Sequence, residues 1–172
     1  SMAREEAGSG KGSEKHPLPG DADNRANGQK GIVQTLSEEF QRLADRSQDA
    51  IYQFDIESQS FTFFNKLFLE VYGSDRPGGK RLSLESVFER IHPDDRLRAR
   101  AAQRDTIKGG LREGEVDYRI INPDGSIRWV QDKWTITRDT DGQAVAIEGF
   151  IRDNTRRRQA EEEFLSLIHI SE

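Results

Sequence analysis

Apolar and polar residues alternate as in strands over most of the second half of the chain. Strands are predicted over residues 114–121, 126–138 and 144–152. The segments between them, 122–125 (Asn-Pro-Asp-Gly) and 139–142 (Asp-Thr-Asp-Gly), place glycine where a hairpin turn needs a positive φ. The pattern therefore predicts three antiparallel strands joined as a meander.

The first half of the chain begins with a helical pattern. A capping box of Thr35 and Glu38 predicts a helix that starts there and ends near Ser47. The helix is amphipathic, and its apolar stripe consists of Leu36, Phe40, Leu43 and Ala44. Because so short a helix is marginal in water, the stripe is expected to pack on the sheet or on a second chain.

Short elements fill the middle of the chain. Segments rich in aromatic and β-branched residues predict strands at 51–56 and 61–65. Helices are predicted at 67–72, 84–91 and 93–108, and a loop at 75–79; a charged helix is predicted from 153 to 163. This order of elements indicates an α+β fold with one antiparallel sheet.

Composition narrows the classes of function. The chain has 172 residues, a net charge of -5 and a mean hydropathy of -0.84. We expect neither nucleic-acid binding nor a membrane span. The lack of cysteine excludes disulfides, thiolate zinc sites and cysteine nucleophiles. Since the N-terminus has no secretion signal, a cytoplasmic location is expected.

Three runs carry a family resemblance: residues 91–96 (Ile-His-Pro-Asp-Asp-Arg), the hairpin 117–130, and the exit 149–155 (Gly-Phe-Ile-Arg-Asp-Asn-Thr). Together they resemble the PAS domain, in the subgroup that ends in an Asp-x-Thr motif. The resemblance implies a five-stranded antiparallel sheet with short helices on one face and flanking N- and C-terminal helices. The PAS domain is assigned to 49–155, after an amphipathic helix (32–48) and before an exit helix with a truncated tail (156–172). Residues 1–31 have few apolar side chains, which predicts a disordered or vector-derived tail.

The resemblance also implies a function. PAS domains of this kind are sensory and dimerisation modules of bacterial signal-transduction proteins, such as the histidine kinases of two-component systems and cyclic-di-nucleotide enzymes. The implied partners are a second copy of the chain, an output domain of the full-length protein and a small-molecule ligand. The stripe residues Leu36, Phe40 and Leu43 are the expected dimer interface. Asp153 and Thr155 are the expected signal relay, with Thr155 as the N-cap of the exit helix.

A ligand cleft, if the fold has one, is expected among the aromatic residues. The candidates are Phe54, Phe63, Phe68, Phe88, Tyr118 and Trp129. Trp129 and Trp134 lie five residues apart on one strand and so face opposite sides of the sheet. Apolar residues on both faces require a second covering layer, either the N-terminal helix or a partner subunit.

Catalysis and metal binding find no support in the sequence. His92 is the only histidine between residues 17 and 168, and Pro93, Asp94 and Asp95 after it are typical of a helix start. We therefore interpret His92 as a helix cap and expect no enzymatic activity, no metal and no cofactor. The alternative is a redox or gas sensor that holds haem or a non-covalently bound flavin, and a third hypothesis is a small α+β enzyme.

Overall fold

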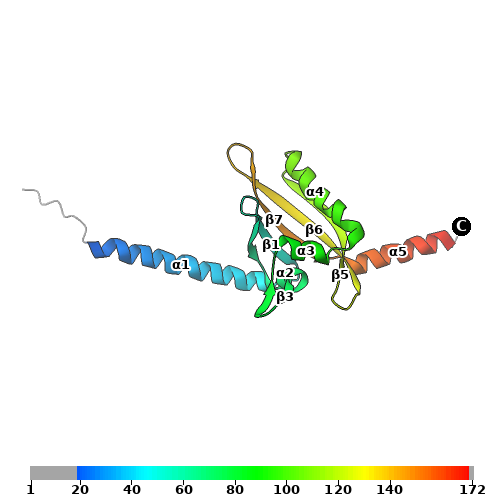
Figure 1. Cartoon of the computed structure of the whole chain (residues 1–172), viewed down its shortest axis with the longest axis horizontal. Helices are drawn as coiled ribbons and strands as arrows, with labels where there is room; N and C mark the ends of the chain where they lie inside the picture. The colour runs from blue at the N-terminus through cyan, green and yellow to red at the C-terminus, as the bar shows by residue number, and fades with distance from the viewer. Residues whose placement is uncertain (1–18, 171–172) are drawn as a thin grey trace, which may run out of the picture. The chain divides into compact units, whose positions relative to one another are not determined.

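Five antiparallel strands form the central sheet of the computed structural model, which describes residues 19–170 (Figure 1). Their order is β2-β1-β7-β6-β5. The strands are β1 (Ala50–Asp55), β2 (Ser60–Phe64), β5 (Glu113–Ile121), β6 (Ile127–Arg138) and β7 (Ala144–Asp153). The predicted sheet and its two Gly-containing hairpins are confirmed, and each strand end lies within one residue of its predicted position.

Short helices cover one face of the sheet, here called the inner face (Figure 1). They are α2 (Lys66–Tyr72), α3 (Leu84–Arg90), the 3-10 turn η1 (Pro93–Asp95) and α4 (Arg96–Lys108). Alternate strand residues such as Tyr52, Tyr118 and Ile147 are buried beneath them. The α+β class and the arrangement expected from the resemblance are therefore confirmed.

Two glycines make room for bulky groups on the inner face. In the strand register, Gly114 and Gly149 flank Trp134 from either side. A Cβ on Gly149 would lie 2.5 Å from the Tyr52 ring, and one on Gly114 would lie 2.6 Å from the indole nitrogen of Trp134. No side chain fits at either position without displacing an aromatic ring.

A buried ion pair attaches the start of α4 to the sheet. Asp95 is buried, and its carboxylate accepts three hydrogen bonds from Arg119 on β5, at 2.8, 2.9 and 2.8 Å. Arg98 lies 3.5 Å from the same carboxylate. Hydrogen bonding to Arg119 lowers the pKa of Asp95 to about 2.

The N-terminal helix differs from the prediction at its start. The chain divides into two units at Glu39/Phe40, and α1 (Pro19–Asp45) runs through that boundary. The expected tail (1–31) is thus helical from Pro19, and its first 18 residues lie outside the described part. The capping box is absent, because the Thr35 hydroxyl donates to the carbonyl of Gly31 within the helix. Polar residues extend a helix without leaving an apolar stripe to reveal it.

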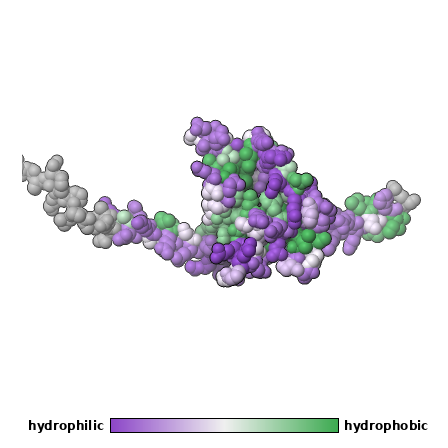
Figure 2. Space-filling model, viewed as in Figure 1, coloured by the Kyte–Doolittle hydropathy of each residue, from purple (hydrophilic) through white to green (hydrophobic). Residues whose placement is uncertain are grey.

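Two further elements differ from the prediction. A small hairpin of β3 (Ser74–Arg76) and β4 (Gly79–Arg81) occupies the expected loop at 75–79, with positive φ at Gly78 and Gly79 in its turn. Strands of three residues are too short to show an alternating pattern. The exit helix α5 (Thr155–Ile170) continues seven residues beyond the expected end at 163. Figure 2 shows hydrophobic surface at its far end, where Phe164, Leu165, Leu167 and Ile170 are exposed.

Candidate functional site

A cavity of about 60 Å³ lies between the inner face of the sheet and the short helices. Its wall is mainly aromatic and aliphatic, with four polar side chains, and comprises Tyr52, Phe54, Phe61, Phe68, Leu84, Val87, Phe88, Ile91, Ala99, Gln103, Val116, Tyr118, Asp132, Ile147 and Ile151. An apolar concave space with few polar groups is the usual form of a ligand site. We call this space the inner cavity.

Asp132 places a carboxyl group in the wall of the inner cavity. Its neighbours on the same face of β6 are the apolar residues Val130 and Trp134, and Asp132 itself is 5% exposed. The Tyr52 hydroxyl donates a hydrogen bond of 2.9 Å to its Oδ1, and Gln103 on α4 donates to that hydroxyl at 3.4 Å. Burial raises the pKa of Asp132 to about 7, while the hydrogen bond from Tyr52 opposes the rise.

Two more phenols complete the polar cluster. The Tyr72 and Tyr118 hydroxyls lie 2.7 Å apart and share a hydrogen bond. Burial raises the pKa of both tyrosines, and that of Tyr52, above the ordinary value. All three phenols therefore stay neutral near pH 7, and Asp132 is the cavity group that titrates there.

The structure divides the predicted cleft residues between the two faces of the sheet. Phe54, Phe68, Phe88 and Tyr118 line the inner cavity. The other two, Phe63 and Trp129, lie on the opposite, outer face: Phe63 pairs with Gln53, and Trp129 lies one position from the buried Val130. As predicted, Trp129 and Trp134 face opposite sides.

A bulge in β2 explains the position of Phe63. The register shifts between Gln53 and Phe54, so that Phe61 pairs with Phe54 and faces inward while Phe63 pairs with Gln53. Phe61 and Phe63 are two residues apart and would share a face in a regular strand. Alternation along the sequence alone therefore gives the wrong face for Phe63.

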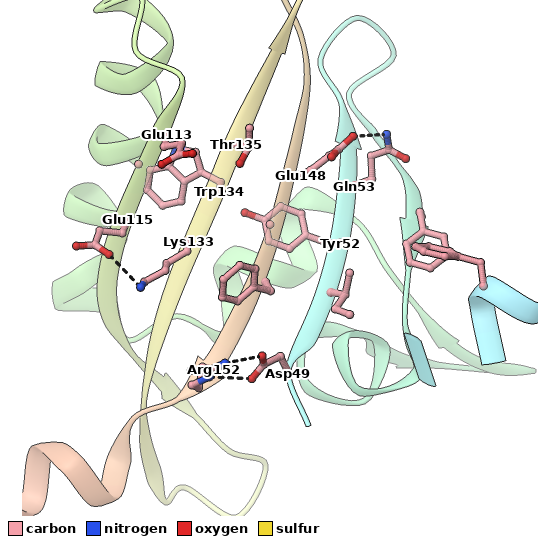
Figure 3. Close-up of a pocket in the computed structure, with 16 residues that line it drawn as sticks. Asp49, Tyr52, Gln53, Glu113, Glu115, Lys133, Trp134, Thr135, Glu148 and Arg152 are labelled. Carbon is pink, nitrogen blue, oxygen red and sulfur yellow. Dashed lines mark hydrogen bonds and ion pairs between the residues drawn. The ribbon is translucent and has the colours of Figure 1, made fainter. Parts of the chain in front are cut away.

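The outer face of the sheet carries a broad, open depression with a volume of about 1100 Å³ (Figure 3). Phe40 reaches it from the end of α1, with its ring centroid 5.2 Å from that of Phe63. Around the apolar centre lie polar pairs: Arg152 with Asp49 at 3.1 Å, Lys133 with Glu115 at 3.8 Å, and Gln53 with Glu148 at 3.1 Å (Figure 3). This surface combines an apolar middle with a polar rim, as protein interfaces do.

The predicted stripe on α1 is exposed at the three positions named for an interface. Leu36, Phe40 and Leu43 are 60%, 59% and 66% exposed. Ala44, the fourth stripe residue, is buried, and the Asn65 side chain donates to its carbonyl. Three large apolar side chains exposed on one helix face are available to a partner.

The junction between the sheet and α5 holds the predicted relay residues. The prediction of Thr155 as the N-cap of α5 was wrong, because α5 begins at Thr155 itself. Its hydroxyl accepts a hydrogen bond of 3.0 Å from the backbone N–H of Trp129 and so joins β6. Asp153 accepts the N–H of Thr155 at 2.9 Å and lies 3.8 Å from Arg128. Both residues therefore sit where the sheet ends and the helix begins.

Arg158 and Asp117 complete this junction and were not predicted. Arg158, in the first turns of α5, donates to the Asp117 carboxylate on β5 at 2.9 Å. Its guanidinium also lies 4.2 Å from the centroid of the Trp129 ring, which Arg119 contacts from β5 at 5.4 Å. The basic run at 156–158 gave no signal for this role, because the partners lie about 30 to 40 residues away along the chain.

His92 is the histidine that a haem or metal sensor would need as a ligand. Its Nδ1 accepts the backbone N–H of Asp94 at 3.2 Å, so the predicted helix cap is confirmed. Among the side chains that the structure describes, those of residues 25–170, no group of three or more His, Cys, Asp or Glu is placed to hold a metal ion. No described helix has both the length and the apolar character that a membrane crossing needs.

Comparisons with known proteins agree with this geometry. The family described as the PAS fold matches residues 61–151. A curated relative, the methyl sulfide methyltransferase-associated sensor of Methanosarcina acetivorans, is 32% identical over 82 residues, which are 48% of this chain and 8% of that protein. This chain therefore corresponds to a small part of that relative.

Solved structures share the fold. A sensory box histidine kinase/response regulator from Burkholderia thailandensis matches with a TM-score of 0.59 and 22% identity, over 77% of this chain and 97% of that one. The N-terminal domain of a diguanylate cyclase with PAS/PAC sensor from Marinobacter aquaeolei matches with a TM-score of 0.54 and 23% identity, over 64% and 98%. At these identities the likeness concerns the fold.

Proposed function

This chain belongs to the PAS fold family, and on that premise we propose that it is a cytoplasmic sensory and dimerisation module of a larger bacterial signal-transduction protein. In this proposal it passes a conformational signal to an output domain, that of a histidine kinase or a cyclic-di-nucleotide enzyme, and has no catalytic activity of its own. The observation that carries the proposal is the position of β6. This strand contributes Asp132 to the inner cavity and bonds through Trp129 to the start of α5.

Strand β6 supports a route from ligand to exit helix. Asp132 and Trp129 lie three residues apart and face opposite sides of the sheet. A ligand that displaces β6 at Asp132 also moves the backbone that holds Thr155 and the ring against which Arg158 stacks. Asp153 and Thr155 are then the residues through which the movement leaves the sheet.

Dimerisation is proposed through the stripe Leu36, Phe40 and Leu43. Its large apolar side chains are exposed, and Phe40 borders the hollowed outer face of the sheet. A two-fold contact in which one patch meets its own copy is the commonest way for soluble chains to pair. The same contact would bury apolar surface of the outer face, such as Phe150, which is 41% exposed.

The oligomeric state tests the dimerisation part of the proposal. The double change Phe40→Glu and Leu43→Glu should convert a dimer into a monomer, because it places charges within the apolar contact. The matched control is Gln34→Glu with Arg42→Gln, which lowers the net charge equally but on the opposite side of the helix. Multi-angle light scattering distinguishes the species, and a wild type that is monomeric at high micromolar concentration would contradict the proposal.

The alternative, a sensor built around haem or flavin, finds less support. The inner cavity measures about 60 Å³, far below the roughly 300 Å³ at which pockets for drug-sized ligands begin. The His92 imidazole, the histidine considered as a haem ligand, accepts the backbone N–H of Asp94 through Nδ1 and does not line the cavity. An absorption spectrum of freshly purified protein separates the two readings, since a Soret or flavin band would favour the alternative.

A further inference from the structure

We propose that the inner cavity binds a small organic cation, an ammonium compound of about four or five non-hydrogen atoms, with Asp132 as its counter-charge. The proposal rests on the sensory function proposed above and assigns a chemical class to the ligand. Three features of the cavity support it: an uncompensated carboxyl group, aromatic walls and a small volume.

The carboxyl group has no cationic partner in the cavity. The wall contains no lysine, arginine or histidine among the described residues. Within that part of the chain, the hydrogen-bond donor to the Asp132 side chain is the neutral Tyr52 hydroxyl, which occupies Oδ1. A carboxylate has room for about four donated hydrogen bonds, so an ammonium group entering the cavity finds free acceptor positions and an unopposed negative charge.

Aromatic rings form a continuous wall beside this carboxyl. Tyr52 and Phe68 lie 5.1 Å apart between centroids, Phe61 and Phe68 5.3 Å, and Phe54 and Phe61 5.0 Å. The faces of such rings attract cations, most strongly where water is excluded. Phe88, on the opposite wall, already carries the Arg100 guanidinium 4.5 Å from its centroid on the side of α4. A carboxylate next to several rings is the combination that recognises ammonium groups.

The volume sets the size of the ligand. One water-sized group needs ~10–15 Å³ of such space, so 60 Å³ accommodates about four to six, which covers the four or five non-hydrogen atoms of the proposed ligand. Leu84 belongs to the wall and is 37% exposed, so the cavity approaches the surface beside α3. Alkylammonium ions of the size of isopropylammonium fit, whereas a ligand with a fused ring system does not.

Binding of a cation should be coupled to the ionisation of Asp132. The titratable groups around this carboxyl are Tyr52 on β1, Tyr72 on α2 and Tyr118 on β5. The charged Arg128, on the same strand as Asp132, acts on Tyr72. Elements α3 and β7 contribute apolar side chains to the cavity, and α4 contributes the neutral Gln103. The phenols stay neutral near pH 7, so Asp132 is the group that must lose its proton when a cation binds.

A titration of the full chain with isopropylammonium chloride tests the proposal. Heteronuclear NMR should show saturable shifts at residues of the inner cavity, and calorimetry in two buffers should show release of up to one proton below pH 7. The affinity should rise about tenfold per pH unit below the pKa of Asp132 and level off above it. Propan-2-ol has the same shape without the charge, and it should bind at least tenfold more weakly at pH 8.

Two variants locate the interaction. Asp132→Asn should weaken isopropylammonium binding by roughly 10- to 100-fold, since it removes a charge-assisted hydrogen bond. The matched control Glu115→Gln removes an exposed carboxylate from the outer face and should leave binding unchanged. If Asp132→Asn fails to fold, the pH dependence of the wild type decides in its place.

Other results would overturn the cation hypothesis. Affinity that does not change between pH 5 and 8, equal binding of propan-2-ol, or shifts confined to the outer face would each do so. Equal binding of the alcohol inside the cavity would leave the sensory function standing and refute the ligand class alone. A wild-type monomer in light scattering would instead contradict the proposed dimer and leave the cavity unaffected.

Discussion

Replacing Asp95 with asparagine should destabilise the protein by about 2–3 kcal/mol, because the change breaks a buried ion pair that joins two elements. Asp95 precedes α4, and its carboxylate receives the backbone N–H and two guanidinium N–H groups of Arg119 on β5. Asparagine has the same shape, but it carries no charge and can accept through only one oxygen. The bidentate contact is then lost without creating a cavity.

The magnitude follows from the ionisation of the carboxyl group. The pKa of Asp95 falls from 3.8 to about 2, and each unit corresponds to ~1.4 kcal/mol of preference for the charged form. Its interactions with the arginines therefore contribute roughly 2–3 kcal/mol at neutral pH. Arg119 is 28% exposed and regains some hydration when its partner is lost, which keeps the cost below that of a fully buried pair.

The pH dependence gives this prediction a sign. A carboxyl whose pKa is lower in the folded state stabilises the protein above its unfolded pKa, and the contribution is lost as pH falls through the folded pKa. The stability difference between wild type and Asp95→Asn should therefore be full above about pH 5 and shrink steadily towards pH 2. Other titrating groups, including Asp132, are common to both proteins, so their effects cancel in the difference.

Urea unfolding followed by circular dichroism measures this difference at a series of pH values. Asp94→Asn is the matched control, because its side chain is 77% exposed and its carboxylate lies 3.9 Å from the ring nitrogen Nδ1 of His92, without a bidentate arginine contact. We expect the control to cost less than about 0.5 kcal/mol. Equal costs for the two variants, or a cost for Asp95→Asn that stays constant down to pH 2, would refute the reasoning.

Three other variants test the packing and the junctions. Gly149→Ala should lower the free energy of unfolding by about 1–3 kcal/mol, since the methyl group would meet the Tyr52 ring; an unchanged urea midpoint would contradict this. Arg158→Ala should accelerate hydrogen exchange in α5 more than Asp153→Ala does, because Arg158 both stacks on an indole and bonds a sheet carboxylate; equal protection would argue against it. His92→Ala should cost about 0.5–2 kcal/mol in thermal unfolding, as loss of a helix cap does, and a smaller change would mean that the cap contributes little.

The elements that the sequence predicted correctly are those defined by local chemistry. The three long strands alternate with period two, and their turns contain Gly125 and Gly142, whose φ values are +84° and +81°. The start of η1 likewise depends on neighbouring residues, with His92 bonded to Asp94 two positions later. Each of these features depends on residues that are close together in the sequence, so tertiary contacts do not alter it.

The elements that the sequence missed depend on contacts between distant residues. Phe63 lies on the outer face and not on the predicted inner face, because β2 has a bulge where it pairs with β1. Arg158 contributes to the junction through an ion pair with Asp117, which is 41 residues away in the sequence. Asp132 was detectable in principle, since it interrupts an otherwise apolar series of inward positions on β6. An isolated carboxylate in such a series indicates either a structural partner or a site, and the sequence does not distinguish the two.

The two faces of β6 explain why this strand is the expected point of coupling. Inward, Trp134 lies between Gly114 and Gly149, whose lack of a side chain leaves room for the Trp134 and Tyr52 rings, and Asp132 lines the cavity. Outward, the backbone of Trp129 holds the start of α5. Its N–H donates a hydrogen bond to the Thr155 hydroxyl, and its carbonyl accepts one of 2.7 Å from the N–H of Asn154. Strand β6 lies between β7 and β5, and a closely packed sheet has little free space to absorb a shift of such an interior strand. We therefore expect that ionisation of Asp132 displaces β6 and that this displacement shifts the start of the exit helix α5. The other strands should keep their register.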